Sequence, residues 1–184
     1  MRKKDWYENW FCSAYYNLLY EERDELEAAA FIDALLKHLQ PEQGSRMLDI
    51  ACGEGRFAKK LAERDYNVTG IDLSHASIQN AKQHETDNLH FYVHDMRLPF
   101  YFNYFDYAFN FFTSFGYFGK ERDHMMAAAS FGKSLKKGGI LVVDYFNTQY
   151  VIDHLVEKET VNKNDHEFQI TRNVTDGYIV KDIR

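Results

Sequence analysis

The sequence predicts an α/β protein with a mostly parallel central sheet and helices on both faces. Helical and strand patterns alternate regularly along the chain, with no internal repeat. The strand segments are nearly continuous apolar runs, which is typical of parallel strands covered on both sides. The 184 residues, 45% hydrophobic and 27% charged, fit a single globular domain. Within it we expect an N-terminal aromatic and helical segment (1–43), a core (44–147) and a C-terminal segment (148–184).

Each element of this core follows from a local pattern. Apolar residues at helical spacing predict a first core helix that ends before Pro41 and Gly44: Ala28, Phe31, Ile32, Leu35, Leu36 and Leu39. Ser74 is a typical N-cap for a helix that runs to about His84. The remaining predicted helices span 56–64 and 121–135. The five predicted strands span 47–52, 67–72, 89–94, 105–112 and 139–146.

The C-terminal segment predicts a short helix over 149–156, a polar stretch and then a β-hairpin. Asp176-Gly177 lies between two strand-like runs, 168–174 and 178–184, which is a strong hairpin signal. The hairpin either supplies the last two strands of the central sheet or forms an element outside it that covers the substrate. We favour the second alternative, on a chain truncated at its C-terminus, because Ile179, Val180 and Ile183 end the sequence.

The most informative segment runs from Leu48 to Asp72. It joins an apolar strand, a turn with Gly53 and Gly55, a helix and a second strand that ends in a carboxylate. The turn also satisfies the dinucleotide pattern G-x-G-x-x-A, but Asp49 and Glu54 would repel a pyrophosphate. Carboxylates suit a cationic ligand instead, so the segment favours S-adenosylmethionine over NAD.

These residues resemble the class I S-adenosylmethionine-dependent methyltransferases, in particular small bacterial ones with a motif like LDxACGxGR. The resemblance covers the chain from roughly Trp6 to Asn147 and implies a Rossmann-like fold. It implies that Asp49 orients the turn and the ligand's amino group, that Gly53 and Gly55 line the methionyl part, and that Asp72 holds the ribose. One departure is Phe57, where similar proteins often have His.

The resemblance also places cofactor contacts outside the glycine turn. Asp95 would accept from the adenine amino group while Met96 covers the ring, although Asp95 is also a common turn residue before Pro99. Tyr15 or Tyr16 would belong to a lid over the methyl donor, or to a helix packed at the sheet edge. The full set of candidate cofactor-binding residues is Tyr15, Tyr16, Asp49, Ala51, Cys52, Gly53, Gly55, Arg56, Asp72, Leu73, Asp95, Met96, Asn110 and Phe111.

The methyl acceptor is expected to be a small molecule. A net charge of −6 argues against a nucleic-acid partner, and the segment after the fourth strand lacks the paired prolines typical of enzymes that methylate base amines. Methyl transfer needs mainly alignment and exclusion of water, so no catalytic residue is assigned. If a base is needed, the candidates are Tyr117, His124, Asp144 and Tyr145. No ligand spacing indicates a metal site.

Two other function classes stay open from the sequence. The first is a domain that binds S-adenosylmethionine without catalysis, and the second is an NAD-dependent oxidoreductase, which would lack a Tyr-x-x-x-Lys pair here. No apolar run of about 18 residues predicts a membrane span, so we expect a cytoplasmic protein. We expect it to be a monomer or a homodimer. Cys12 and Cys52 are expected to be reduced.

Overall fold

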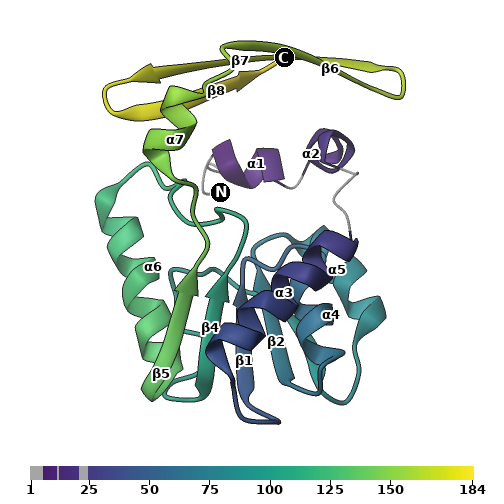
Figure 1. Ribbon diagram of the computed structural model, residues 1–184, viewed down its shortest axis with the longest axis vertical. Helices are drawn as coiled ribbons and strands as arrows, with labels where there is room; N and C mark the ends of the chain where they lie inside the picture. Colours follow the sequence, from purple (N-terminus) through teal and green to yellow (C-terminus); the bar gives the residue numbers. More distant parts are fainter. Residues whose placement is uncertain (1–5, 12, 21–24) are drawn as a thin grey trace, which may run out of the picture. The chain divides into compact units, whose positions relative to one another are not determined.

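The computed structural model describes residues 6–11, 13–20 and 25–184 (Figure 1). The expectation that Cys12 is reduced lies outside these residues. Contacts divide the chain into two compact units, which are described separately. The first contains Met1–Cys12 and Arg23–Tyr145, and the second contains Ser13–Glu22 and Phe146–Arg184.

A five-stranded parallel sheet forms the centre of the first unit. Its strands follow the order β3-β2-β1-β4-β5, so the chain reverses direction across the sheet between β1 and β4. The strands are β1 (Arg46–Ile50), β2 (Asn67–Asp72), β3 (Leu89–Val93), β4 (Phe105–Asn110) and β5 (Leu135–Val143). This arrangement confirms the predicted α/β fold. In such sheets, ligands bind beyond the carboxyl ends of the strands, near the reversal point.

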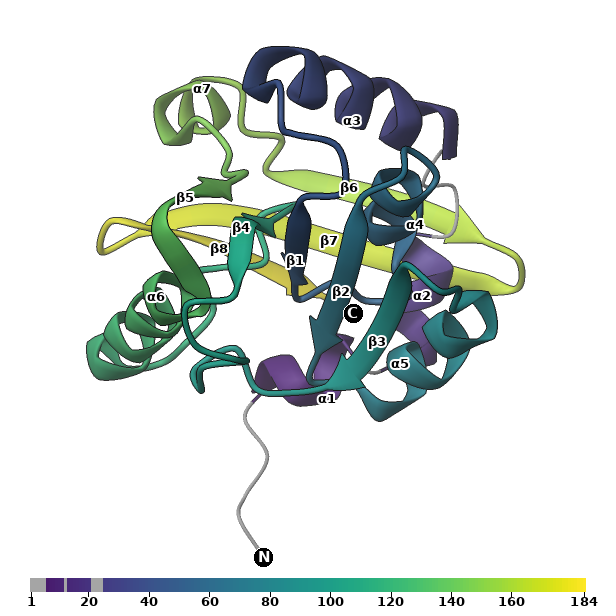
Figure 2. The same ribbon diagram turned by 90° about the horizontal axis from the view of Figure 1, so that it is seen from below.

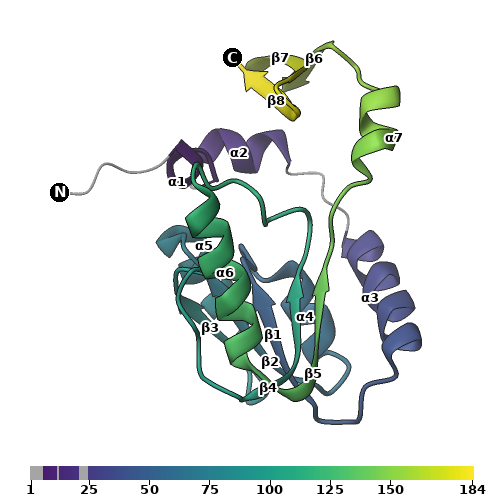
Figure 3. The ribbon, with the colours of Figure 1, turned by 90° about the vertical axis from the view of Figure 1, so that its left-hand side faces the viewer.

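Helices cover both faces of this sheet. Successive strand residues point to opposite sides, so nearly continuous apolar strands present apolar side chains on both faces. The helices of the unit are α1 (Trp6–Phe11), α3 (Glu25–Leu39), α4 (Arg56–Ala62), α5 (His75–Ala81), the short 3-10 helix η1 (Lys82–His84) and α6 (Glu121–Ser134). Figures 2 and 3 show α3 and α4 on one face and α6 on the other. The core is correspondingly split into two clusters.

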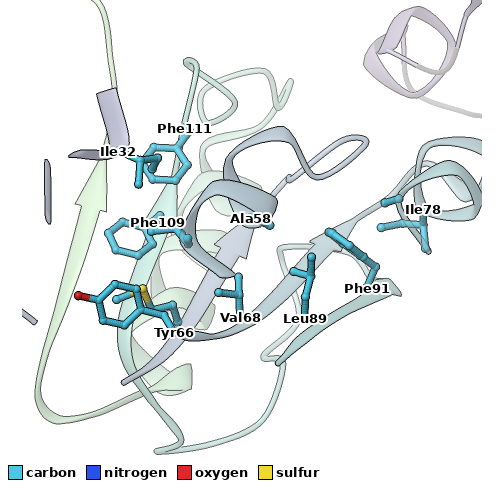
Figure 4. Packing of buried hydrophobic residues seen from close by; sticks show 12 residues of the cluster. Ile32, Ala58, Tyr66, Val68, Ile78, Leu89, Phe91, Phe109 and Phe111 are labelled. Carbon is cyan, nitrogen blue, oxygen red and sulfur yellow. The ribbon is translucent and has the colours of Figure 1, made fainter. Parts of the chain in front are cut away.

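The larger cluster lies between the sheet and the helices α3, α4 and α5 (Figure 4). Ile32 of α3, Ala58 of α4 and Ile78 of α5 pack there against strand residues such as Val68 and Phe91. The smaller cluster joins Leu48 and Ile50 of β1 to Ala127 and Phe131 of α6. Both clusters are almost completely buried, so β1 is covered on both sides, as its apolar sequence predicts.

Several predicted boundaries are shifted by a few residues. The fourth strand ends at Asn110 instead of Phe112, because Phe112 and Thr113 have left-handed backbone angles that end the strand. The fifth strand begins at Leu135 and ends at Val143, earlier than predicted. Ser74 caps α5 as predicted, since its hydroxyl accepts from the Ser77 N–H.

The second unit contains α2 (Ala14–Leu19), α7 (Thr148–Asp153) and a separate antiparallel sheet of β6 (Lys158–Lys163), β7 (His166–Thr175) and β8 (Tyr178–Ile183). The hairpin around Asp176-Gly177 therefore lies outside the central sheet, as expected. No strand was predicted in the preceding polar stretch, but β6 pairs with β7 there along six residue pairs. Among the described residues, no helix is both long and apolar enough to span a bilayer.

Candidate functional site

The predicted site residues of the first unit gather at the carboxyl edge of the central sheet. Five candidates, Ala51 to Gly53, Gly55 and Arg56, lie in the turn between β1 and α4 or at the start of that helix. Ala51 adopts a left-handed conformation with φ of 61°, and the turn is closed by a 2.9 Å hydrogen bond from Gly55 N–H to the Cys52 carbonyl. A second bond, from Cys52 N–H to the Ile71 carbonyl at 3.0 Å, ties the turn to β2.

The two glycines of this turn have different surroundings. A Cβ on Gly53 would meet no heavy atom within 4 Å, so this side of the turn is open. A Cβ on Gly55 would lie 2.5 Å from Cε1 of Phe91, well inside van der Waals contact. Both residues have positive φ, 56° and 79°. Gly53 therefore leaves space on the ligand side, whereas Gly55 lets the ring of Phe91 pack beneath the turn.

Asp72, at the end of β2, holds this turn in place. One carboxylate oxygen accepts from the Gly53 N–H at 2.9 Å, and the other accepts from the Ser74 N–H at 2.8 Å. Burial raises the pKa of the Asp72 carboxyl, while the N–H groups of Ser74, Gly53 and Leu73 oppose that shift. Leu73, another predicted site residue, lies between Asp72 and Ser74 in the chain and is half-buried.

Asp49 is the most unusual group of the site. It is 1% exposed, and neither carboxylate oxygen makes a full hydrogen bond with any described residue. Burial raises the pKa of Asp49 to about 7, and the negative charge of Asp72 adds to the shift, while the backbone N–H of Ala58 opposes it. Burying a carboxyl with so little hydrogen bonding is costly, and a ligand that donates to it would offset this cost.

Asn110 carries a third buried acceptor atom without a described partner. Its amide nitrogen donates to the Ile50 carbonyl at 2.9 Å, which joins the ends of β4 and β1, and its Oδ1 accepts nothing from the described residues. Asn110 and Asp49 thus lie near the carboxyl ends of two neighbouring strands. Both present hydrogen-bond acceptors, which suits a ligand with donors or positive charge.

The aromatic residues after Asn110 separate into core and surface. Phe111 is 3% exposed, and its ring packs 4.8 Å from that of Phe57. Phe112 is 47% exposed, and the guanidinium of Arg56 lies 5.9 Å from the centre of its ring. Phe111 is one of the predicted cofactor-binding residues, and Phe112 is not. A strand pattern cannot reveal the left-handed turn that exposes the second ring.

Asp95 follows β3 at the same edge, and the structure pairs it with Arg97. The guanidinium donates to both Asp95 carboxylate oxygens, with a shortest distance of 2.6 Å, and the Arg97 N–H adds a 3.0 Å bond. Arg97 also lies 3.6 Å from Asp123 of α6. Met96 packs against the smaller core cluster. This ion pair was not predicted from the sequence.

Tyr15 and Tyr16 lie in the second unit. The ring of Tyr15 packs edge-on against His166 and Phe168 of β7, at centroid distances of 5.6 and 6.5 Å. Tyr16 packs against Tyr20, and its N–H is capped by the Ser13 hydroxyl at 3.1 Å. Their contribution to a lid stays a prediction.

The candidate bases have structural contacts. His124 is half-buried between the rings of Phe115 and Phe118, and Tyr117 packs against Trp6 and Phe11 of α1. Tyr145 is 49% exposed, and its hydroxyl lies near Gly116. Asp144 binds backbone N–H groups after β4. Among the described residues, no three His, Cys, Asp or Glu side chains are grouped to hold a metal ion.

A cavity of about 260 Å³ lies in the first unit, but at the amino ends of the strands. Its lining includes Arg46, Asn67, His90 and Tyr104 and none of the candidate cofactor residues. Because ligands of open α/β sheets bind at the carboxyl edge, we do not assign this cavity to the site.

Comparison with known proteins gives an independent view of this arrangement. A family model described as a methyltransferase domain matches residues 41–182. The chain is 29% identical over 141 residues to a protein of Geobacillus sp. (strain WCH70) whose name includes methyltransferase but no substrate. That alignment covers 75% of this chain and 57% of the relative.

A second relative carries a substrate in its name. The chain is 31% identical over 132 residues to the dTDP-3-amino-3,4,6-trideoxy-alpha-D-glucopyranose N,N-dimethyltransferase of Streptomyces venezuelae, covering 70% of this chain and 54% of the relative. A shorter match covers 32% of this chain and 13% of a 23S rRNA uracil methyltransferase of Shewanella frigidimarina. The chain thus spans little more than half the length of the Geobacillus and Streptomyces relatives.

Among solved structures, an S-adenosylmethionine-dependent methyltransferase from Clostridium acetobutylicum matches with a TM-score of 0.70. The match covers 92% of this chain and 70% of that one at 20% identity. At this identity the likeness shows a shared fold.

Proposed function

Because this chain belongs to the methyltransferase domain family, we propose that it transfers the methyl group of S-adenosylmethionine to a small-molecule acceptor. The family model spans 41–182, which includes most of both compact units. We therefore treat the chain as one methyltransferase domain, with an N-terminal segment (1–43), a cofactor-binding core (44–147) and a C-terminal segment (148–184) as its parts.

The observation that carries this proposal is the pair of unpartnered carboxylate oxygens on Asp49. They are buried beside a turn whose Gly53 faces open space. A pyrophosphate would add negative charge next to Asp49 and Asp72, at a cost in free energy. A ligand with an ammonium group would instead donate to these oxygens and neutralise their charge.

The residues present therefore fit S-adenosylmethionine. When bound, this molecule supplies a methyl group on a positively charged sulfur, which a nucleophilic acceptor takes by in-line displacement. In this proposal Asp49 and Asn110 face the methionyl end, and Asp72 accepts from the ribose while it anchors Gly53. Asp95 and Met96 hold the adenine, with Arg97 fixing the Asp95 carboxylate.

A small-molecule acceptor agrees with three features. The net charge is −6, the segment after β4 contains no proline, and the amino-sugar relative matches 70% of the chain. Nucleotide-linked amino sugars are accordingly the first acceptors to test. A neutral amine attacks the methyl group through its lone pair and loses one proton after the transfer, so an amine acceptor needs no strong base.

Calorimetric titration with S-adenosylhomocysteine and with NAD tests the donor. We expect the wild-type chain to bind S-adenosylhomocysteine and not NAD, and Asp72→Ala to bind it at least ten-fold more weakly. Tight NAD binding without any response to S-adenosylhomocysteine would contradict the proposal. Cofactor binding without methyl transfer to any member of an acceptor panel would favour a non-catalytic domain.

A further inference from the structure

Two consecutive residues, which follow β4 after Phe111, hold a backbone conformation that non-glycine residues avoid. Phe112 has φ of 56° and Thr113 has φ of 53°, both in the left-handed region. This region is costly for residues with a Cβ, and most costly for a β-branched residue such as threonine. Such strain persists only where the surroundings enforce it, and it is concentrated at functional sites.

Asp144, the residue after β5, enforces this turn. Its Oδ2 accepts from the Phe112 N–H at 2.8 Å, and its carbonyl accepts from the Thr113 N–H at 3.1 Å. Its own N–H donates to the Asn110 carbonyl at 2.9 Å. Asp144 thus binds Asn110 at the end of β4 and both left-handed residues, Phe112 and Thr113, although it lies more than 30 residues later in the chain.

The turn changes which side chain faces solvent. Phe111 is 3% exposed in the core, but Phe112 is 47% exposed and lies near Arg56, the first residue of α4. Because β4 adjoins β1, the ring of Phe112 stands at the sheet edge that carries the glycine turn. A methyl acceptor must approach the donor from this edge.

We propose that Phe112 contacts a flat or apolar part of the acceptor and that Asp144 positions it by holding the 112–113 turn. The acceptor contact rests on the proposed function, whereas the positioning stands on the hydrogen bonds alone. In this role Asp144 acts through Phe112, because one oxygen of its carboxylate accepts from the Phe112 N–H.

Hydrogen exchange at individual backbone amides, measured by NMR, tests the positioning. In Asp144→Ala, the amide of Phe112 should exchange at least ten-fold faster than in the wild type, while amides of β2 stay unchanged. Asp144→Asn is the matched control, because its amide oxygen can still accept from Phe112, and exchange should rise less than three-fold. Equal exchange in the wild type and Asp144→Ala would overturn the positioning.

Titration and kinetics test the acceptor contact. Phe112→Ala and Asp144→Ala should bind S-adenosylhomocysteine within three-fold of the wild type, and each should raise KM for the acceptor identified by the panel about ten-fold or more. Asp144→Asn should keep KM for the acceptor close to that of the wild type. Adding Thr113→Gly to Asp144→Ala should also recover part of the loss, because glycine adopts positive φ without strain.

The outcomes separate the two proposals. If the variants lose S-adenosylhomocysteine binding as strongly as acceptor binding, Phe112 belongs to the cofactor site and the acceptor contact is wrong. If the wild type itself does not bind S-adenosylhomocysteine, the proposed function fails and the acceptor contact fails with it. The exchange measurement still decides in that case whether Asp144 holds the turn.

Discussion

Asp72 accepts a 2.9 Å hydrogen bond from the N–H of Gly53, so the carboxylate that ends β2 holds the turn that follows β1. The two residues are 19 positions apart in the chain. Each role proposed for the turn depends on this connection, because it sets the direction in which the open side of Gly53 faces.

The two glycines of the turn should respond differently to alanine. We expect Gly55→Ala to lose about 3 kcal/mol of unfolding free energy, since its Cβ would overlap Phe91 and its φ is positive. Gly53→Ala should lose only about 1 kcal/mol, because no atom opposes its Cβ. Urea unfolding measures both values. Gly53→Ala should also weaken S-adenosylhomocysteine binding at least ten-fold. Unchanged affinity would show that the ligand does not contact the turn at Gly53.

Asp49 should make the ligand-free protein less stable as pH rises. The pKa of Asp49 is about 7 in the folded protein, and its ordinary value is 3.8. Between pH 3.8 and pH 7 the folded state therefore binds a proton that the unfolded state has lost. Stability from this group is complete below pH 4 and is lost as pH rises to about 7, by up to about 4 kcal/mol. Urea unfolding at pH 5 and pH 8 measures the loss, and Asp49→Asn provides the control because it cannot titrate. Equal pH dependence in both proteins would contradict the raised pKa.

Cofactor binding should release this proton. An ammonium group beside Asp49 favours the carboxylate, so titration with S-adenosylhomocysteine near pH 6.5 should release roughly half to one proton. Calorimetry in two buffers of different ionisation enthalpy measures the number. Asp49→Asn should bind more weakly and release none, and a wild type without proton release would place the ammonium elsewhere.

Arg97 should be needed for tight binding of the adenosyl group. It is 11% exposed and holds the Asp95 carboxylate, so Arg97→Ala frees the side chain that we assign to the adenine amine. We expect about ten-fold weaker binding of S-adenosylhomocysteine. Arg172→Ala is the matched control, since it breaks a similar 2.6 Å contact with Glu159 in the separate C-terminal sheet and should leave affinity unchanged. Equal affinities of Arg97→Ala and the wild type would remove Arg97 from the site.

The tyrosines predicted for the lid can be tested in the same assay. Tyr15→Ala and Tyr16→Ala should each weaken S-adenosylhomocysteine binding several-fold if either ring covers the donor. Tyr178→Ala, at a ring that is 73% exposed on β8, should leave the affinity unchanged. Losses of thermal stability without any loss of affinity would assign both residues to packing within the second unit.

The order of elements around the site could be predicted from the sequence. Apolar runs, the Ser74 cap and the glycine turn define strand, turn and helix through short-range effects, and these lie where the patterns place them. The same patterns put Asp49, Asp72 and Asp95 near the carboxyl ends of parallel strands. Strand β6 was missed because its polar, lysine-containing sequence has no core-facing alternation, and pairing with β7 stabilises it.

Which atoms face one another was decided by the tertiary structure. Gly53 and Gly55 look alike in the sequence, but the packing of Phe91 from β3 makes one open and the other buried. Likewise, Asp144 accepts from the N–H of Phe112, whose ring is exposed, while Phe111 enters the core. Arg97 pairs with Asp95 and lies 3.6 Å from Asp123 of α6. Local periodicity fixes the secondary structure of a segment. The partners of its polar and aromatic groups depend on contacts between segments far apart in the chain.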